Sequence, residues 1–410
     1  MGARPRSLIT IPELLVAARI EAPAGAGAAD GQPRTGRRAH GERPGGSPAR
    51  YDPPAMASRI PLILDVDTGI DDALALLYAA ASDEAEIVAV TCVGGNVDAR
   101  QVAENTLAVL ELAGRADVEV ALGREQPLVR PLETTPETHG PRGLGYAELP
   151  PPERPLSPRH AADLLIDEAR RRPGEITLVT LGPLTNLAVA LLREPELPRL
   201  LKRYVLMGGA YRSPGNTAPT TEWNIRVDPD AAKVVFAAWG RANQEHGTPR
   251  PVALGLDVTE RAKITPEHVV RLARRAGSTP DDTIVLAHGE DPMHATRSVA
   301  RNPVVRFIAD ALRFYMEFHR RYDGFYGAFI HDPLAVAAAL DPGLVRTSAL
   351  AVDVELGGTL TTGETVTDWR RVWNRPPNLD VAVEADADEF LERVIERVGR
   401  LAADRVNVAR

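Results

Sequence analysis

The chain has a single cysteine, Cys92, among its 410 residues. One thiol cannot form an intramolecular disulfide or a thiolate metal site, so a reducing, cytoplasmic location is expected. No apolar run approaches the roughly 18 residues of a membrane helix, which argues against a membrane partner. Acidic residues outnumber basic ones and the formal net charge is −8. This charge argues against nucleic acid or an anionic membrane as the main partner.

The first 57 residues are expected to be a disordered extension. Residues 21–54 are mostly Ala, Gly, Pro and Arg, which bury too little apolar surface to offset the entropy of ordering. A signal peptide over residues 7–20 is the alternative, but Pro12, Glu13 and Arg19 interrupt its apolar core. Met56 directly precedes the first predicted strand and is a candidate start of translation. Residues 58–410 are expected to form the catalytic domain.

The remaining sequence alternates apolar, β-branched runs with helical patterns. Strands are predicted at residues 61–67, 87–95, 176–182, 204–209 and 252–257, and helices at 71–81, 102–113, 160–172 and 228–239. This alternation predicts an α/β fold, an open and mostly parallel doubly wound sheet in one domain, with helices on both faces. Ligands of such sheets bind beyond the carboxyl ends of the strands. Residues 277–302 are polar, with two X-Pro bonds, and are expected to be a loop insertion.

Four carboxylates crowd the end of the first predicted strand, in the segment LDVDTGIDDALALLYA. Asp65 and Asp67 share one face of the strand end because side chains alternate. Asp71 and Asp72 open the next helix, where carboxylates suit the helix dipole. Helix capping alone does not need four carboxylates within eight residues. Crowded carboxylates share protons or bind a cation, and all-oxygen ligands favour Ca²⁺ or Mg²⁺ over zinc.

Two other metal motifs fit this segment less well. An EF-hand loop counted from Asp65 requires glycine at its sixth position and glutamate at its twelfth. Ile70 and Leu76 occupy those positions, which excludes the EF-hand. A haloacid-dehalogenase-like phosphatase also places a DxD pair after a strand, but Thr68 follows Asp67 directly and the Asp71–Asp72 pair is additional. That phosphatase remains the enzymatic alternative.

The segment ILDVDTGIDDALAL resembles the signature of the inosine–uridine preferring nucleoside hydrolases, which are ribonucleoside N-glycohydrolases. Further segments match this family in the same order: VGGN at 93–96, HGPRGLG at 139–145, LVTLGPLTN at 178–186, VLMGGA at 205–210, GNTAPTTEWNI at 215–225, HDP at 331–333 and TVTDWR at 365–370. The resemblance runs from about residue 60 to the C-terminus. The N-terminal extension and residues 277–302 depart from the family pattern.

The resemblance implies Ca²⁺-dependent hydrolysis of the N-glycosidic bond of purine and pyrimidine ribonucleosides, which gives free base and ribose. By position, the metal ligands would be Asp67, Asp72, the main-chain carbonyl of Leu181 and Asp332, with Asp65 as an alternative. Asp67 would also take the proton from the attacking water, because a calcium site needs a carboxylate base. His331 would protonate the departing base.

The resemblance also implies a set of substrate-binding residues. They are Asp71, Asn96, Met207, Asn216, Glu222, Trp223, Asn224 and, beside the leaving group, His139. Tyr322, Phe325 and Tyr326 are expected to form an aromatic wall around the base, with core packing as the alternative. The family implies a homodimer or homotetramer. The alternative from another class is a nucleoside-binding protein with weak catalysis. The sequence does not decide the base preference.

Overall fold

The computed structural model describes residues 59–283 and 296–408, and all of them belong to one compact unit. The expected extension, residues 1–57, lies outside the described residues. Residues 284–295 of the expected 277–302 insertion also lie outside them. The described parts of that insertion contain a short 3₁₀ turn, η1 (Pro280–Asp282), and an irregular stretch that leads into the next helix.

An eight-stranded sheet forms the centre of the fold, in the order β3-β2-β1-β4-β5-β6-β12-β9. All neighbouring strands are parallel except β9, which runs antiparallel to β12 at one edge. The strands are β1 (Ile60–Val66), β2 (Ala85–Cys92), β3 (Glu119–Leu122), β4 (Thr177–Thr180), β5 (Arg203–Met207), β6 (Val252–Leu254), β9 (Val345–Leu350) and β12 (Leu379–Ala385). The predicted open, mostly parallel sheet is therefore confirmed.

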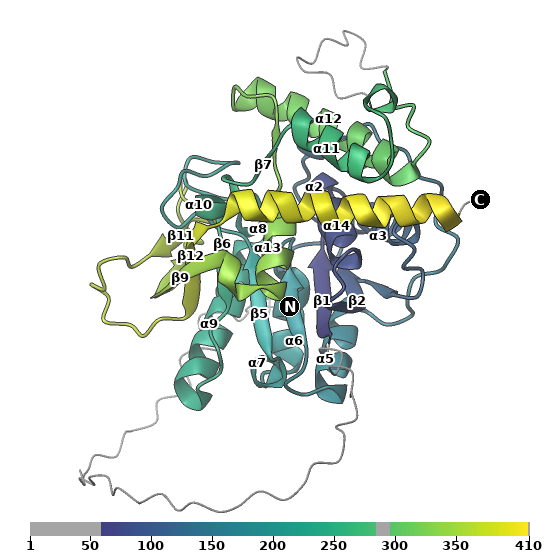
Figure 1. Ribbon diagram of the computed structural model, residues 1–410. Coiled ribbons are helices and arrows are strands. Elements are labelled where there is room, and N and C mark those ends of the chain that lie inside the picture. The colour runs from purple at the N-terminus through teal and green to yellow at the C-terminus, as the bar shows by residue number, and fades with distance from the viewer. Residues whose placement is uncertain (1–58, 284–295, 409–410) are drawn as a thin grey trace, which may run out of the picture. The chain divides into compact units, whose positions relative to one another are not determined.

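Helices pack on both faces of this sheet (Figure 1). On β1, Leu62, Leu64 and Val66 face one hydrophobic core and Ile63 faces the other, as the alternation of side chains along a strand requires. The first core includes α2 (Ile70–Ala80), α3 (Ala99–Leu112), α11 (Pro266–Arg275), α12 (Pro303–Tyr322), α13 (His331–Leu340) and α14 (Ala387–Val408). The second includes α5 (Ala161–Arg171), α6 (Thr185–Arg193), α7 (Leu197–Leu200) and α9 (Pro229–His246).

Local sequence signals set several helix ends. The Asp98 side chain accepts hydrogen bonds from the backbone N–H groups that begin α3, and Asn302 does the same for α12. Helix α9 runs through Gly240, beyond the predicted end at residue 239, and ends at Gly247, which takes the left-handed conformation.

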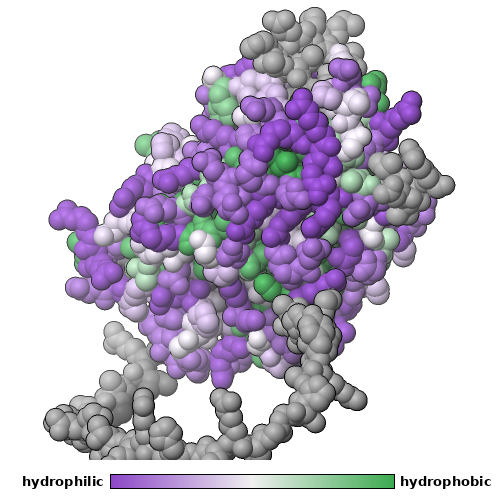
Figure 2. Space-filling model, in the orientation of Figure 1, coloured by the Kyte–Doolittle hydropathy of each residue, from purple (hydrophilic) through white to green (hydrophobic). Residues whose placement is uncertain are grey.

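Shorter elements complete the described structure. They are α4 (Pro136–His139), α8 (Trp223–Val227), α10 (Leu256–Thr259), η2 (Pro342–Leu344), and two small antiparallel pairs, β7 (Lys263–Ile264) with β8 (Ala328–Phe329) and β10 (Val352–Val354) with β11 (Thr365–Thr367). None of the described helices is long and apolar enough to cross a membrane. The face seen in Figure 2 is mainly hydrophilic, with scattered hydrophobic residues.

The strand order has a switch point between β1 and β4. From β1 the chain proceeds to β2 and β3 on one side, and it returns to β4, β5 and β6 on the other. Open α/β sheets bind ligands at such a point, beyond the carboxyl ends of the strands. Asp67 follows the end of β1 and Leu181 follows the end of β4, so the expected metal ligands lie at this position.

Candidate active site

A cavity of about 430 Å³ opens at the switch point. Of the predicted site residues, all but Asp65 and Asp72 line it: Asp67, Asp71, Asn96, His139, Leu181, Met207, Asn216, Glu222, Trp223, Asn224, His331 and Asp332. These residues come from segments spread over more than 260 positions of the chain. The fold thus assembles one site from the separate motifs.

The carboxylates cluster at the floor of this cavity. One oxygen each of Asp71, Asp72 and Asp332 lies within 4.8 Å of the others, close enough to share a metal ion. Asp67 adjoins the group, since its backbone N–H donates to Asp72 Oδ1 at 3.2 Å. Asp72 Oδ2 accepts further hydrogen bonds from Gly69 N at 2.9 Å and Asn96 Nδ2 at 3.3 Å. Asp71, which the resemblance assigned to the sugar, therefore belongs to the same carboxylate group as Asp72 and Asp332, two of the assigned ligands.

Two glycines make room for the Asp67 carboxylate. A Cβ at Gly95 would stand 2.1 Å from Asp67 Oδ2, and one at Gly182 would stand 2.8 Å from Oδ1. Oδ2 accepts a hydrogen bond from Asn96 N at 2.9 Å. Oδ1 is buried and has no hydrogen-bond partner among the described residues. A buried carboxylate oxygen without a donor is costly, so this atom calls for a ligand that the chain itself does not supply.

Burial raises the pKa of every carboxyl group in the cluster, and repulsion by neighbouring carboxylates raises it further at Asp67, Asp71 and Asp332. Burial, followed by the charge of Asp72, raises the pKa of Asp71 to about 8. The same two causes raise the pKa of Asp67, and burial with the charges of Asp71 and Asp72 raises that of Asp332. Full ionisation of the cluster requires a compensating positive charge. The cluster supplies only oxygen donors, which fits a hard divalent cation.

Asp65 lies beside the cluster, and other partners hold only one of its two carboxylate oxygens, because Oδ2 is buried without a hydrogen-bond partner among the described residues. Its Oδ1 accepts hydrogen bonds from Thr91 Oγ1 at 2.5 Å and Asn186 Nδ2 at 2.8 Å. Burial raises its pKa to about 7. Asp65 does not line the cavity, so its contacts favour a supporting role beneath the site.

Asn224 and Leu181 meet on the opposite wall. Asn224 Nδ2 donates to the Leu181 carbonyl at 2.6 Å and lies 3.3 Å from the carbonyl of Met207. A carbonyl oxygen has two lone pairs, so Leu181 can accept this bond and still face a cation.

The Glu222 carboxylate is held by backbone donors. Oε2 accepts hydrogen bonds from Gly209 N at 2.8 Å and Ile225 N at 3.1 Å, and Oε1 accepts one from Asn224 N at 2.8 Å. Glu222 thereby caps α8 and fixes the first turn of this helix, which carries Trp223 and Asn224. Asn216 Oδ1 accepts from Trp223 N at 3.1 Å, which ties the loop before α8 to the helix.

His331 and His139 also line the cavity, and they have different hydrogen-bond partners. The Thr259 hydroxyl donates to the Gly255 carbonyl at 3.2 Å, so its oxygen accepts from His331 Nδ1–H at 2.8 Å. His139 Nδ1 accepts from Ile70 N at 3.1 Å, at the start of α2. Neutral His139 therefore carries its proton on Nε2, whereas neutral His331 carries it on Nδ1. Burial lowers the pKa of each imidazole to about 3.

The aromatic wall differs from the one expected. Tyr322 lines the cavity, but Phe325 and Tyr326 do not: Phe325 stacks on His319, and Tyr326 packs against the main core. The lining residues that the sequence analysis missed are Thr135, Glu137, Thr138, Gly215, Thr217, Glu260, Tyr315, Phe318, His319, Asp323 and Phe329. The spacing of Tyr315, Phe318, His319 and Tyr322 along one helical face was a signal for this wall, but a core-facing helix shows the same pattern.

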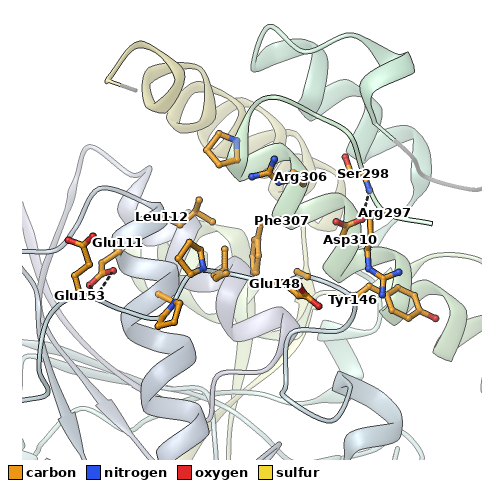
Figure 3. Close-up of a pocket in the computed structure, with 16 residues that line it drawn as sticks. Glu111, Leu112, Tyr146, Glu148, Glu153, Arg297, Ser298, Arg306, Phe307 and Asp310 are labelled. Atoms are coloured by element: carbon orange, nitrogen blue, oxygen red, sulfur yellow. Dashed lines mark hydrogen bonds between the residues drawn. The ribbon is translucent and has the colours of Figure 1, made fainter. Parts of the chain in front are cut away.

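A second cavity, of about 600 Å³, lies between α3 and the start of α12 (Figure 3). Its lining includes Glu111, Tyr146, Arg297, Phe307 and Asp310. It contains none of the predicted site residues and no group of carboxylates close enough to hold a metal among the described residues. The smaller cavity at the switch point is therefore the candidate active site.

The fold and the cavity together define a class of protein. It has a doubly wound α/β fold and, at the switch point of the sheet, a carboxylate cluster that suits a metal ion. Residues 62–392 match the family described as inosine-uridine preferring nucleoside hydrolase. The chain therefore belongs to this family, whose members are N-glycosidase enzymes.

Individual relatives agree with this assignment. An inosine-uridine preferring nucleoside hydrolase from Leishmania major is 37% identical over 83% of this chain and 98% of its own length. A pyrimidine-specific ribonucleoside hydrolase from Enterobacter sp. is 36% identical over 84% of this chain and 99% of its own. The solved structure of a purine-preferring ribonucleoside hydrolase from Gardnerella vaginalis is 32% identical, with a TM-score of 0.72. The match covers 84% of this chain and 99% of the Gardnerella chain. These relatives differ in the base they are named for.

Proposed function

We propose that the protein hydrolyses the N-glycosidic bond of purine and pyrimidine ribonucleosides with the help of Ca²⁺, releasing free base and ribose. The observation that supports this proposal best is the combination of two kinds of lining in the cavity at the switch point. The cavity is lined by the carboxylate cluster, with the unpartnered Asp67 Oδ1, and by two imidazoles that contact aromatic rings. A sugar with hydroxyl groups suits the carboxylates and a flat base suits the rings.

The proposed metal ligands are Asp67, Asp72, the Leu181 carbonyl and Asp332. Their oxygen donors fit Ca²⁺, and the orphaned Asp67 Oδ1 supports Asp67 as a ligand. When bound, the cation would offset the carboxylate charges and acidify water at the site. Asp71 and Asn96 would hold ribose hydroxyls on one wall. Asn216, Glu222, Trp223 and Asn224 would contact the sugar on the other, with Met207 beneath it.

The chain's own groups then divide the chemistry. Asp67 takes a proton from the water that attacks C1′, on the face of the sugar opposite the base. The bond from C1′ to the base nitrogen breaks through an oxocarbenium-like transition state, as in an inverting glycosidase. His331 delivers a proton to the departing base. Because Thr259 accepts the Nδ1 proton, the transferred proton is the Nε2 proton of the doubly protonated imidazolium, and the neutral ring left behind keeps the Nδ1 proton. His139, which keeps an Nε2–H when neutral, donates a hydrogen bond to the same leaving group.

Ribose release is the experiment that tests this function. The purified protein is incubated with inosine, uridine and a nucleoside monophosphate, and free ribose and phosphate are measured. Ribose from the nucleosides supports the proposal. Phosphate would indicate the haloacid-dehalogenase-like alternative, and neither product would indicate a nucleoside-binding protein with weak catalysis.

We further propose that the enzyme is a cytoplasmic homodimer or homotetramer and that residues 58–410 contain everything needed for catalysis. The single cysteine supports a reducing compartment. Deletion of residues 1–55 is then expected to leave kcat and the melting temperature unchanged, because most of that segment, residues 21–54, has few apolar side chains to bury. Sedimentation of the full chain and the deletion variant tests the oligomeric state, and a large loss of activity on deletion would contradict the domain assignment.

A further inference from the structure

Glu260 stands out at the end of the cavity that holds the aromatic rings. It directly follows Thr259, whose hydroxyl contacts His331 at 2.8 Å, and it lines the cavity. Lys263 and Asp323 are close enough to influence its charge. The Lys263 ammonium lies over the rings of Phe325 and Phe329, at 4.8 and 5.3 Å.

The other charged groups at this end already have partners. Asp323 Oδ2 is 2.7 Å from His319 Nδ1, and His319 Nε2 accepts from Phe329 N. The side chain of Glu260, by contrast, makes no hydrogen bond or ion pair within residues 59–283 and 296–405. Burial, followed by the charges of Asp323 and Asp257, raises the pKa of Glu260 to about 7. A half-buried carboxylate without a donor is poorly solvated, and a ligand that brings a donor relieves that cost.

We propose that Glu260 is a specificity-determining residue, whose carboxylate accepts a hydrogen bond from an exocyclic amino group of the nucleobase. This inference rests on the proposed function, which places the base between His331 and the aromatic rings. A carboxylate attracts an amino group and repels a keto oxygen at the same position of the ring. Bases that carry an amino group, such as cytosine and adenine, are therefore favoured over their keto counterparts, uracil and hypoxanthine.

Two pairs of substrates isolate this contact. Cytidine and uridine differ at position 4, and adenosine and inosine at position 6, in each case by an amino group against a keto oxygen. The amino-to-keto ratio of kcat/KM is measured for the wild type and for Glu260→Gln and Glu260→Leu. Assays at pH 8.5 keep the carboxylate ionised. The intrinsic reactivity of each nucleoside is the same whether the wild type or a Glu260 variant acts on it. The change in the amino-to-keto ratio of kcat/KM between wild type and variant therefore reports the contribution of Glu260.

The ratio is expected to fall by about 10- to 100-fold in both variants for at least one pair, the range for a hydrogen bond to a charged group. p-Nitrophenyl riboside, which has no base, should be hydrolysed at nearly the wild-type rate. Glu267→Gln removes the same charge from an exposed position on α11 and serves as the matched control, with unchanged ratios.

Two outcomes would overturn the inference. Ratios within twofold of the wild type would show that Glu260 does not read the base. Equal losses on all substrates, including p-nitrophenyl riboside, would show that Glu260 only supports the fold. Should Glu260→Leu fail to fold, the nearly isosteric Glu260→Gln decides the question. Failure of the proposed function is distinct, because the wild type itself would then release no ribose from any nucleoside.

Discussion

The ring Nε2 of His319 accepts a hydrogen bond from the backbone N–H of Phe329 at 3.4 Å. Its Nδ1–H therefore donates to Asp323 Oδ2, at 2.7 Å. Through these two bonds one buried imidazole ties the end of α12 to β8, which immediately precedes His331 and Asp332. The fold thus positions two site residues through a histidine for which the sequence offered no role.

Replacing His319 by phenylalanine should destabilise the protein. The variant keeps a ring among Tyr315, Phe325 and Phe329 but leaves the Phe329 N–H without an acceptor. The expected loss is about 1–3 kcal/mol in the free energy of unfolding, the cost of an unsatisfied buried donor. Urea denaturation measures it. Asp323→Asn is the control, because its amide oxygen still accepts from Nδ1–H; an equal loss in both variants would contradict this explanation.

Removal of divalent cations should abolish ribose release, because the carboxylate cluster cannot be fully charged without a positive partner. Ca²⁺ should restore activity and raise the melting temperature, since a ligand that binds only the folded state stabilises it. At a hundredfold excess over Kd the gain is about 2.7 kcal/mol. Differential scanning calorimetry with and without chelator checks this. Full activity in protein shown by elemental analysis to be free of metal would refute the metal requirement.

Asp72→Ala and Asp332→Ala should each lose tight Ca²⁺ binding, as measured by isothermal titration calorimetry. Each removes a carboxylate from the group within 4.8 Å. Asp65→Asn should retain the affinity, because the amide oxygen that it introduces can still accept from Thr91 and Asn186. Wild-type affinity in either alanine variant would remove that residue from the ligand set, whereas a loss in Asp65→Asn would add Asp65 to it.

The cost of losing His331 should depend on the leaving group. A purine or uracil leaves poorly without a proton, whereas p-nitrophenolate leaves readily. His331→Ala should therefore lower kcat for inosine or uridine by about 10²- to 10⁴-fold, the usual contribution of an acid catalyst, and largely spare p-nitrophenyl riboside. Asp67→Asn should damage both substrate types, since both need the attacking water.

His139→Ala shows whether the second imidazole carries part of this work. The quantity to compare is the loss of kcat on inosine or uridine relative to the loss on p-nitrophenyl riboside. If this relative loss is larger in His139→Ala than in His331→Ala, His139 is the acid. Equal losses of His331→Ala on natural and nitrophenyl substrates would instead mean that His331 orients Asp332.

Five of the eight strands of the central sheet, β1, β2, β4, β5 and β6, followed from local signals, whereas β3, β9 and β12 were not predicted. Apolar runs such as residues 61–67 cannot be stable unless both faces are covered, and the alternating helices supply that cover. The carboxylate cluster was also visible, because Asp65, Asp67, Asp71 and Asp72 are neighbours in the sequence and repel one another wherever they lie. The conclusion that a cation site exists there needs no tertiary structure.

The part of the cavity lining that includes Glu260 and the aromatic rings could not be predicted from the sequence, because tertiary structure alone brings these residues together. Glu260, Tyr315 and His319 come from α10 and α12, and only the packing of these helices beside His331 brings them to one wall. The replacement of Phe325 and Tyr326 by Tyr315 and Phe329 in that wall has the same origin, because a helical face of aromatic residues looks alike whether it lines a core or a cavity. The hydrogen bonds that place the proton of His139 on Nε2 and that of His331 on Nδ1 join residues 69 and 72 positions apart. Contacts over such separations leave no local pattern in the sequence, since they depend on which elements meet in space.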